Sequence, residues 1–242
     1  MLAVFLAACR FAGIMLLSPV LGFAGVPALA RVMFVLLFSL VVAAPAAGPI
    51  PSGGIGVGQL TLLAAAAGLQ GALIGAALRA AVAAFGFGGQ LLDFQIGYSA
   101  AAILNPSTEL QSSLISTLLE MFGATLFVVL DFHHDLIRGL AENFQALPLL
   151  TSGDDLIGDV IAQTGELFIY GLALVMPVVV GLFLVDATVA VLSRSMPQIN
   201  IYFVALPFKA FAGLSLLMLS LSYMGPLSRH IFGAVLHGGA GG

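Results

Sequence analysis

Six long apolar runs separated by short polar breaks constrain this chain more than any other feature. Hydrophobic residues make up 61% of its 242 residues and charged residues only 7%, whereas soluble domains carry about 25% charged residues. A helix needs about 20 apolar residues to cross a bilayer, and every run except the fourth is near or above that length. The sequence therefore predicts an all-α membrane protein with about six long hydrophobic helices, at residues 2–21, 28–47, 60–87, 114–130, 167–192 and 202–236.

The breaks between these runs contain residues that end helices. "SPVLGFAGVP" (18–27) joins the first pair of runs, and "PAAGPIPSGG" (45–54) follows the second. Proline and glycine clusters of this kind terminate helices and form turns. Later breaks are "LPLLTSGDD" (147–155) and "SRSMPQIN" (193–200), and the glycine-rich end at 237–242 predicts a flexible tail.

Small residues recur every four positions along the third run. Such a stripe lets helix backbones approach closely inside a membrane, so we expect tight helix packing there. Because a spacing of four exceeds 3.6 residues per turn, the stripe winds around the helix and favours neighbours that cross at an angle. Its members are Ala64, Gly68, Ala72, Ala76, Ala80, Ala84 and Gly88.

Composition also excludes several classes of function. The net charge of −4 and seven scattered basic residues do not form a nucleic-acid-binding surface. Cys9 is the only cysteine, so no internal disulfide can form. We find neither an activated nucleophile nor a phosphate-binding loop, and therefore predict no catalytic residues, no cofactor and no enzymatic activity.

Several charged residues fall within or beside the apolar runs, where they are costly and usually face a partner, a cavity or one another. One interpretation is mutual pairing, for example of Arg79 with Glu120. The other is a polar path through the protein interior, which we favour for so many charges. The candidates are Arg79, Asp93, Glu120 and Asp186, together with Arg10 and Lys209.

"DFHHDLIR" (131–138) resembles a metal-binding sequence. On a helix, Asp131, His134, Asp135 and Arg138 would share one face. Arg138 would then repel a cation and pair with one of the acids, and His133 would point about 100° away from His134. We therefore predict no metal site here.

Three stretches together resemble one family, the FliR/SctT family of type III secretion export-gate subunits. "LLDFQIGYSAAAILNPSTELQSSLISTLLEMFGATLFVVLDFHHDLIRGL" (91–140) is similar to its signature region, although Asn105 precedes Pro106 where the family usually has aspartate. "MPQINIYFVALPFKAFAGLSLL" (196–217) and "GVPALARV" (25–32) resemble two further signatures in the family's order. The matching positions are Gln95, Gly97 and Ser99; Pro197, Gln198, Asn200, Pro207, Lys209 and Gly213; and Pro27 and Arg31.

The resemblance implies a fold and partners. Residues 1–150 would form a FliP-like part and residues 151–236 a FliQ-like helical hairpin. The protein would assemble with FliP-like and FliQ-like subunits beside an FlhB-like subunit, in the bacterial inner membrane at the flagellar basal body. Unfolded export substrates would pass through the channel so formed. A virulence secretion system would use the same chemistry, and a more distant alternative is a small-solute or proton channel using Asp93, Glu120 and Asp186.

The resemblance also implies a plug that closes the channel. A proline within an apolar run breaks a helix and frees backbone polar groups, which at membrane depth must be buried in protein or line a cavity. Local hydroxyl and amide side chains satisfy such groups. An ordinary exposed loop is the alternative. The expected plug residues are Asn105, Pro106, Ser107, Thr108, Glu109, Leu110, Gln111, Ser112, Ser113 and Leu114.

Overall fold

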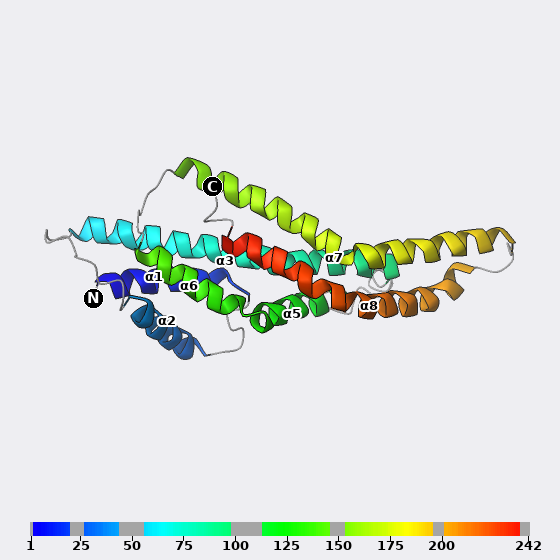
Figure 1. The fold of residues 1–242 in the computed structure, drawn as a ribbon, viewed down its shortest axis with the longest axis horizontal. Coiled ribbons are helices and arrows are strands. Elements are labelled where there is room, and N and C mark those ends of the chain that lie inside the picture. The colour runs from blue at the N-terminus through cyan, green and yellow to red at the C-terminus, as the bar shows by residue number, and fades with distance from the viewer. Residues whose placement is uncertain are drawn as a thin grey trace, which may run out of the picture. The chain divides into compact units, whose positions relative to one another are not determined.

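The computed structural model is almost entirely helical in the regions that it describes, which are residues 2–19, 27–43, 56–97, 113–145, 153–195 and 201–237. A helix occupies each of the six predicted segments, which confirms the all-α fold class (Figure 1). The helices are α1 (Leu2–Leu17), α2 (Ala28–Ala43), α3 (Val57–Ile96), α5 (Leu114–Val129), α6 (Phe132–Gln145), α7 (Gly153–Ser195) and α8 (Ile201–His237).

Within the described regions, fewer helices can cross a membrane than the six apolar runs predict. Three are long and apolar enough: α3, Thr164–Ser195 within α7, and Ala205–Val235 within α8. The α5–α6 pair also qualifies if it is one span, but it is bent by 62°. Helices α1 and α2 have 16 residues each, or about 24 Å against a hydrocarbon core of about 30 Å. Each ends two residues before a proline, Pro19 or Pro45, because the proline ring opposes further helix.

The chain divides into two compact units, each built from separate parts of the sequence. Unit 1 comprises Met1–Ala81, Phe127–Thr164 and Phe232–Gly242, and unit 2 comprises Val82–Leu126 and Gly165–Ile231. In unit 1, α1 packs on α2, and the buried residues between them and the start of α3 are Leu6, Ala7, Val42, Ala43 and Ala67.

Three phenylalanines join the helix ends of unit 1. The rings of Phe127 and Phe132 lie 5.2 Å and 5.3 Å from the ring of Phe232. All three side chains are buried. Offset and tilted aromatic contacts at this distance contribute beyond simple burial, so this cluster ties the end of α5, the start of α6 and the end of α8 together.

In unit 2, α7 and α8 form an antiparallel hairpin (Figure 1). Asp186 of α7 meets Lys209 of α8, and Gly181 of α7 lies against Leu216 of α8. The residue number falls along one helix as it rises along the other, which defines an antiparallel pair. This hairpin lies in the part predicted to be FliQ-like; that likeness, and the division at residue 150, stay predictions. Residues 238–242 of the expected tail lie outside the described regions, whereas His237 is the last residue of α8.

The predicted small-residue stripe of α3 lies at close helix contacts, as expected. In unit 1, a Cβ added to Gly13 of α1 would come within 2.8 Å of the backbone nitrogen of Ala72. In unit 2, a Cβ added to Gly88 would come within 2.8 Å of Val175 of α7. The two ends of the stripe thus contact different helices, as a winding stripe predicts.

Candidate functional site at the junction of α3 and α5

The end of α3 and the start of α5 approach each other unusually closely. Gly86, Gly89 and Asp93 share one face of α3, at spacings of three and four residues. A Cβ added to Gly89 would lie 2.6 Å from the backbone nitrogen of Ser116. The Ser116 hydroxyl donates a hydrogen bond of 2.9 Å to the Gly86 carbonyl. Only glycine at position 89 permits this approach of α5 to α3.

Asp93 lies at this junction, and the residue is only 4% exposed. One carboxylate oxygen, Oδ2, accepts hydrogen bonds from the backbone N–H groups of Ile115 at 3.1 Å and Ser116 at 3.3 Å. These belong to the first turn of α5, whose N–H groups have no partner within the helix. A carboxylate there also meets the positive end of the helix dipole. Asp93 therefore caps α5 from a different helix.

A second, local cap acts at the same point. Ser113 directly precedes α5, and its hydroxyl oxygen accepts a 3.2 Å hydrogen bond from Ser116 N–H. Serine is a favoured residue at this position because its oxygen reaches the third N–H of the helix. Two acceptors therefore cap the start of α5: the hydroxyl oxygen of Ser113, which directly precedes the helix, and the carboxylate of Asp93 from α3.

The backbone of Asp93 also takes part in the C-terminal cap of α3. Its carbonyl oxygen accepts the Gly97 N–H at 3.1 Å, and the Phe94 carbonyl accepts the same N–H at 3.2 Å. Gly97 has φ +91°, a conformation that glycine adopts without the steric cost paid by other residues. This conformation explains why glycine suits position 97.

One residue therefore holds the chain where it leaves α3 and where it enters α5. Residues 98–112 connect these two points and lie outside the described regions, as do Ser99 and plug candidates 105–112. Of the predicted plug, only Ser113 and Leu114 are described; Ser113 is the cap, and Leu114 begins α5 with 58% of its surface exposed.

The other intramembrane charges are distributed differently. Asp186 and Lys209 form an ion pair across the α7–α8 hairpin, with Nζ 2.7 Å from Oδ1 and 2.8 Å from Oδ2. In unit 1, the Arg10 guanidinium donates to the Gln70 side-chain oxygen. The Asp186–Lys209 pair supports the mutual-pairing interpretation for these two residues, whereas Gln70, which Arg10 contacts, is uncharged.

Arg79 and Glu120 are both exposed, and neither has an ion pair within the described part of the chain. The pairing suggested for them from sequence therefore has no support. Glu120 lies instead along α3, where a Cβ added to Gly86 would come within 2.8 Å of the Glu120 Cγ atom.

Of the remaining signature positions that are described, Pro27 and Gly213 make identifiable structural contacts. The Pro27 carbonyl accepts N–H groups from the first turn of α2, and Arg31 is exposed on that helix. Gly213 allows α8 to approach Ile96, since an added Cβ would lie 2.6 Å from the Ile96 side chain. Gln95 is half-buried on α3, and Pro207 is exposed within α8. Pro197, Gln198 and Asn200 lie outside the described regions.

The geometry expected for the histidine segment was wrong. Asp131 is not helical: it has φ +61° and occupies the turn before α6, where its carboxylate lies 3.3 Å from His134 Nδ1. The ring centroids of His133 and His134 lie 4.1 Å apart, with the rings tilted by 39°, instead of diverging. One ligand atom from each of these three residues lies within 4.8 Å of the others.

The two histidine rings can meet because the helix backbone fixes only the direction of each Cα–Cβ bond. Rotation about χ1 then brings the neighbouring rings together. Arg138 has no ion pair with Asp131 or Asp135 in the described structure, so that part of the expectation was also wrong. The cluster sits at the positive end of α6, which disfavours a cation. The absence of a bound metal stays a prediction.

The sequence analysis did not predict that Asp93 contacts the start of α5. The signal was present in two parts: a serine immediately before an apolar run marks a helix start, and two glycines precede Asp93 on one face of α3. Neither part indicates which helix the carboxylate reaches. Gln70 as the partner of Arg10 was also missed, and a glutamine inside an alanine-rich run gives no signal of its partner.

Helices long and apolar enough to cross a membrane define this chain as an α-helical membrane protein. The chain belongs to the bacterial export proteins, family 1, whose family model matches residues 1–235. It is 33% identical over 229 residues to the flagellar biosynthetic protein FliR of Caulobacter vibrioides, which covers 90% of this chain and 89% of that protein.

Two other relatives are informative. The flagellar biosynthetic protein FliR of Bacillus subtilis is 28% identical over 228 residues, covering 92% of this chain and 87% of that protein. The secretion system apparatus protein SsaT of Salmonella typhimurium is 26% identical over 138 residues, covering 56% of this chain and 53% of that protein. These similarities confirm the family resemblance read from the three signature stretches.

Proposed function

We propose that this protein is a core subunit of the flagellar type III protein export gate, located in the bacterial inner membrane at the flagellar basal body. The main support for this proposal is that the chain is similar to a flagellar biosynthetic protein over 90% of the chain's length. Family membership makes the chain a subunit of an export apparatus. We propose that its partners are FliP-like and FliQ-like subunits and an FlhB-like subunit, and that unfolded export substrates are its cargo.

Residues 105–114 would close the channel in the resting state. The junction of α3 and α5 supports this role because it fixes both points between which the segment runs. The polar side chains of the segment would close a pore without binding a passing chain through apolar contacts. The subunit would perform no chemistry itself, and the energy for transport would come from partner proteins and the proton gradient.

The virulence-type system is the second candidate, supported by the similarity to SsaT. The flagellar assignment is favoured because the FliR similarity extends over 90% of the chain and the SsaT similarity over 56%. A strain lacking this gene should lose motility and flagellar filaments while effector secretion into the medium continues. Loss of effector secretion with normal motility would reverse the assignment.

The plug assignment is tested by replacing residues 105–112 with a glycine–serine segment of equal length. This change keeps Ser113, which caps α5, and so leaves the described junction intact. We expect normal co-purification with the FliP-like and FliQ-like subunits but a raised leak of ions and small dyes from liposomes that contain the complex, because the channel has lost its closure.

A matched control replaces residues 48–55, between α2 and α3, with the same glycine–serine sequence of eight residues. This variant should leak no more than the wild-type complex. If the 105–112 variant assembles and its conductance stays at background, the plug assignment is wrong.

A further inference from the structure

We propose that a cavity between α1, α2 and α6 binds a phospholipid of the membrane. One acyl chain occupies the cavity, the other lies in an adjoining groove between α1 and α2, and the phosphate lies beside Arg31. The whole site belongs to unit 1 and is formed by described residues. It goes beyond the proposed function and does not depend on it, because a membrane protein meets lipid in any assembly.

The cavity has a volume of about 240 Å³ and is lined by apolar side chains with one exception. Its wall is formed by α1, α2, α6 and the end of α5, and four phenylalanines contribute to it: Phe11, Phe34, Phe38 and Phe127. An apolar cavity of roughly 150 Å³ stays free of water and takes up a benzene ring. Hydrocarbon is therefore the expected occupant of this larger cavity.

A groove between α1 and α2 adjoins the cavity. Its volume is about 400 Å³, and Met15 and Val35 line both spaces, so the two lie side by side. Two neighbouring apolar spaces match the two acyl chains that leave one glycerol unit. A single side chain of a partner protein would fill only one of them.

His133 is the exception among the side chains that line the cavity. Its Nδ1 atom is buried and has no hydrogen-bond partner in the described structure. Buried polar groups are nearly always paired, so we expect the occupant to bring a polar atom. A polypeptide segment would bring several backbone N–H and C=O groups, which one imidazole cannot satisfy. An acyl chain brings only its ester carbonyl, and Nδ1 donates to it in the tautomer that carries the proton there.

Arg31 provides the charge that complements a phosphate. It lies in the first turn of α2, is exposed and lines the groove. A guanidinium binds phosphate through paired hydrogen bonds, and basic sites between membrane helices are typical of lipid headgroup binding. Among the described residues that line the two spaces there is no aspartate or glutamate to repel an anion.

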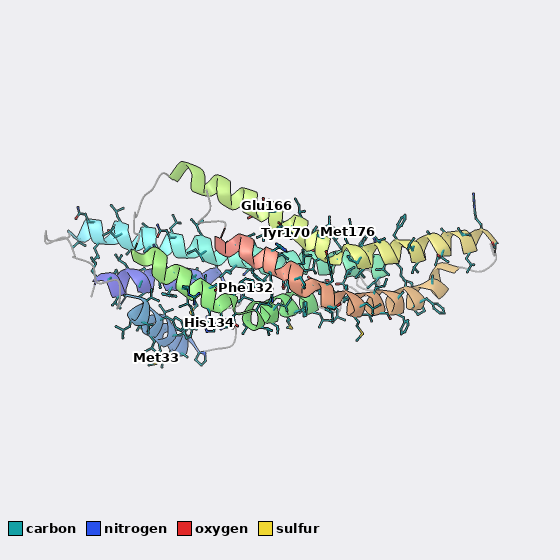
Figure 2. All side chains as sticks on the ribbon, in the orientation of Figure 1. Met33, Phe132, His134, Glu166, Tyr170 and Met176 are labelled. Carbon is teal, nitrogen blue, oxygen red and sulfur yellow. The ribbon has the colours of Figure 1, made fainter. Side chains whose placement is uncertain are left out.

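The groove opens onto an apolar surface of α2. Leu36 lines the groove and is 52% exposed, and Met33, labelled in Figure 2, is 57% exposed on the same helix. Such a surface on a membrane protein meets hydrocarbon or a partner. Lipid chains in the surrounding bilayer can therefore enter the groove directly.

The experiment uses the protein purified with the subunits that accompany it and reconstituted in phosphatidylcholine liposomes. These contain a phosphatidylglycerol with a photoreactive diazirine in one acyl chain. After illumination, peptide mass spectrometry locates the attached lipid. Label is expected on Ile14, Leu136 and Leu140, which line the cavity but are buried from the protein surface, so lipid that merely surrounds the protein does not reach them.

Val35→Phe narrows both spaces and should reduce this label several-fold. Val41→Phe is the matched control, because it makes the same change on the same helix at a position that is 70% exposed and lines neither space. It should leave the label unchanged. If Val35→Phe does not assemble, Ile137→Phe narrows the cavity from α6 and decides in its place.

Arg31→Gln tests the position of the phosphate. Labelling by the photoreactive phosphatidylglycerol should fall several-fold, whereas labelling by the methyl ester of the same photoreactive fatty acid, which has no phosphate, should stay unchanged. Arg229→Gln, at an exposed position of α8, should alter neither. An equal loss with both probes, or no loss with either, overturns the placement of the phosphate at Arg31.

Two further outcomes overturn the lipid site itself. Label that appears on the protein surface but not on the buried lining residues means that a protein segment fills the cavity or that it stays empty. Label on the lining residues that is equal in Val35→Phe and Val41→Phe means that the lipid is not held in these two spaces.

Discussion

At the scale of single residues, the glycines of the α3–α5 junction matter as much as the residues with side chains, because they leave room for close backbone contact. Gly89 has no Cβ, and the space where one would lie is occupied by the backbone of Ser116. Backbone atoms cannot rotate out of the way as a side-chain end can. The approach that lets Asp93 reach α5 therefore depends on Gly89.

Gly89→Ala is expected to push α5 away from α3 and destabilise the assembled complex, because overpacking of a close contact costs about 1–3 kcal/mol. In a protein of this size, each kcal/mol lowers the melting temperature by about 2–4 °C. The measurement is thermal unfolding of the purified complex, followed by the exchange rate at the start of α5, which should rise.

Gly139→Ala is the matched control on α6. Among the described residues, no neighbouring atom lies within 4 Å of the Cβ that this change adds, and alanine favours a helix over glycine by roughly 0.5–1 kcal/mol. This variant should keep or slightly raise the melting temperature. Equal melting temperatures for the two variants would mean that α3 and α5 are not in close contact.

At the scale of helices, the hairpin of α7 and α8 combines apolar packing with one ion pair. Gly181 admits Leu216 of the opposite helix, and Asp186 binds Lys209 through both carboxylate oxygens. The Lys209 side chain is 17% exposed and that of Asp186 is 44% exposed. The pair fixes the register of the two helices at a place where either charge alone would be costly.

Lys209→Met and Asp186→Leu should each lower the melting temperature of the complex, because each leaves one charge without its partner. The double variant should melt closer to the wild type than the worse single variant does, since it leaves no unpaired charge. The measurement is a double-mutant cycle of melting temperatures.

Arg194→Met is the control for the loss of a basic residue, because Arg194 is exposed in the last turn of α7. It should change the melting temperature little. If the double variant loses as much as the two single variants together, the ion pair does not couple the helices.

Local signals explain which elements the sequence predicted. The apolar runs predicted the helices, and the spacing of Gly68, Ala72 and Gly88 predicted close contacts of α3, because both depend on neighbours along the chain. The bend before α6 depends on one left-handed residue, Asp131, where the sequence pattern suggested a continuing helix. The partner of Asp93 lies 22 residues away in the chain, and such tertiary contacts leave no periodic pattern.

At the scale of the whole molecule, the described helices bury little of their apolar surface within this chain. Only 17% of the most apolar window of α3, 28% of that of α7 and 17% of that of α8 is buried. Large side chains such as Phe208, Phe211 and Leu219 of α8 are at least 70% exposed, and Figure 2 shows side chains projecting along α7 and α8. Lipid or partner subunits must cover these surfaces.

If partner subunits cover them, the chain produced alone should be poorly stable, and co-expression with FliP-like and FliQ-like subunits should stabilise it. Binding partners stabilise a folded protein through mass action. We expect the isolated chain to aggregate in mild detergent or to be degraded in cells. The chain co-expressed with its partners should elute as one complex with a higher melting temperature. The measurements are size-exclusion chromatography and thermal unfolding in the same detergent.

A small-solute or proton channel gives the opposite result, because such a protein needs only itself and lipid. It would remain monodisperse when produced alone and would conduct in liposomes without partners. Co-expression with an unrelated apolar membrane protein controls for a general effect of membrane-protein load, and it should not stabilise the chain. An isolated chain that is stable, monodisperse and conducting would replace the export-gate assignment with the channel, whereas an unstable chain rescued only by its partners leaves the channel without support.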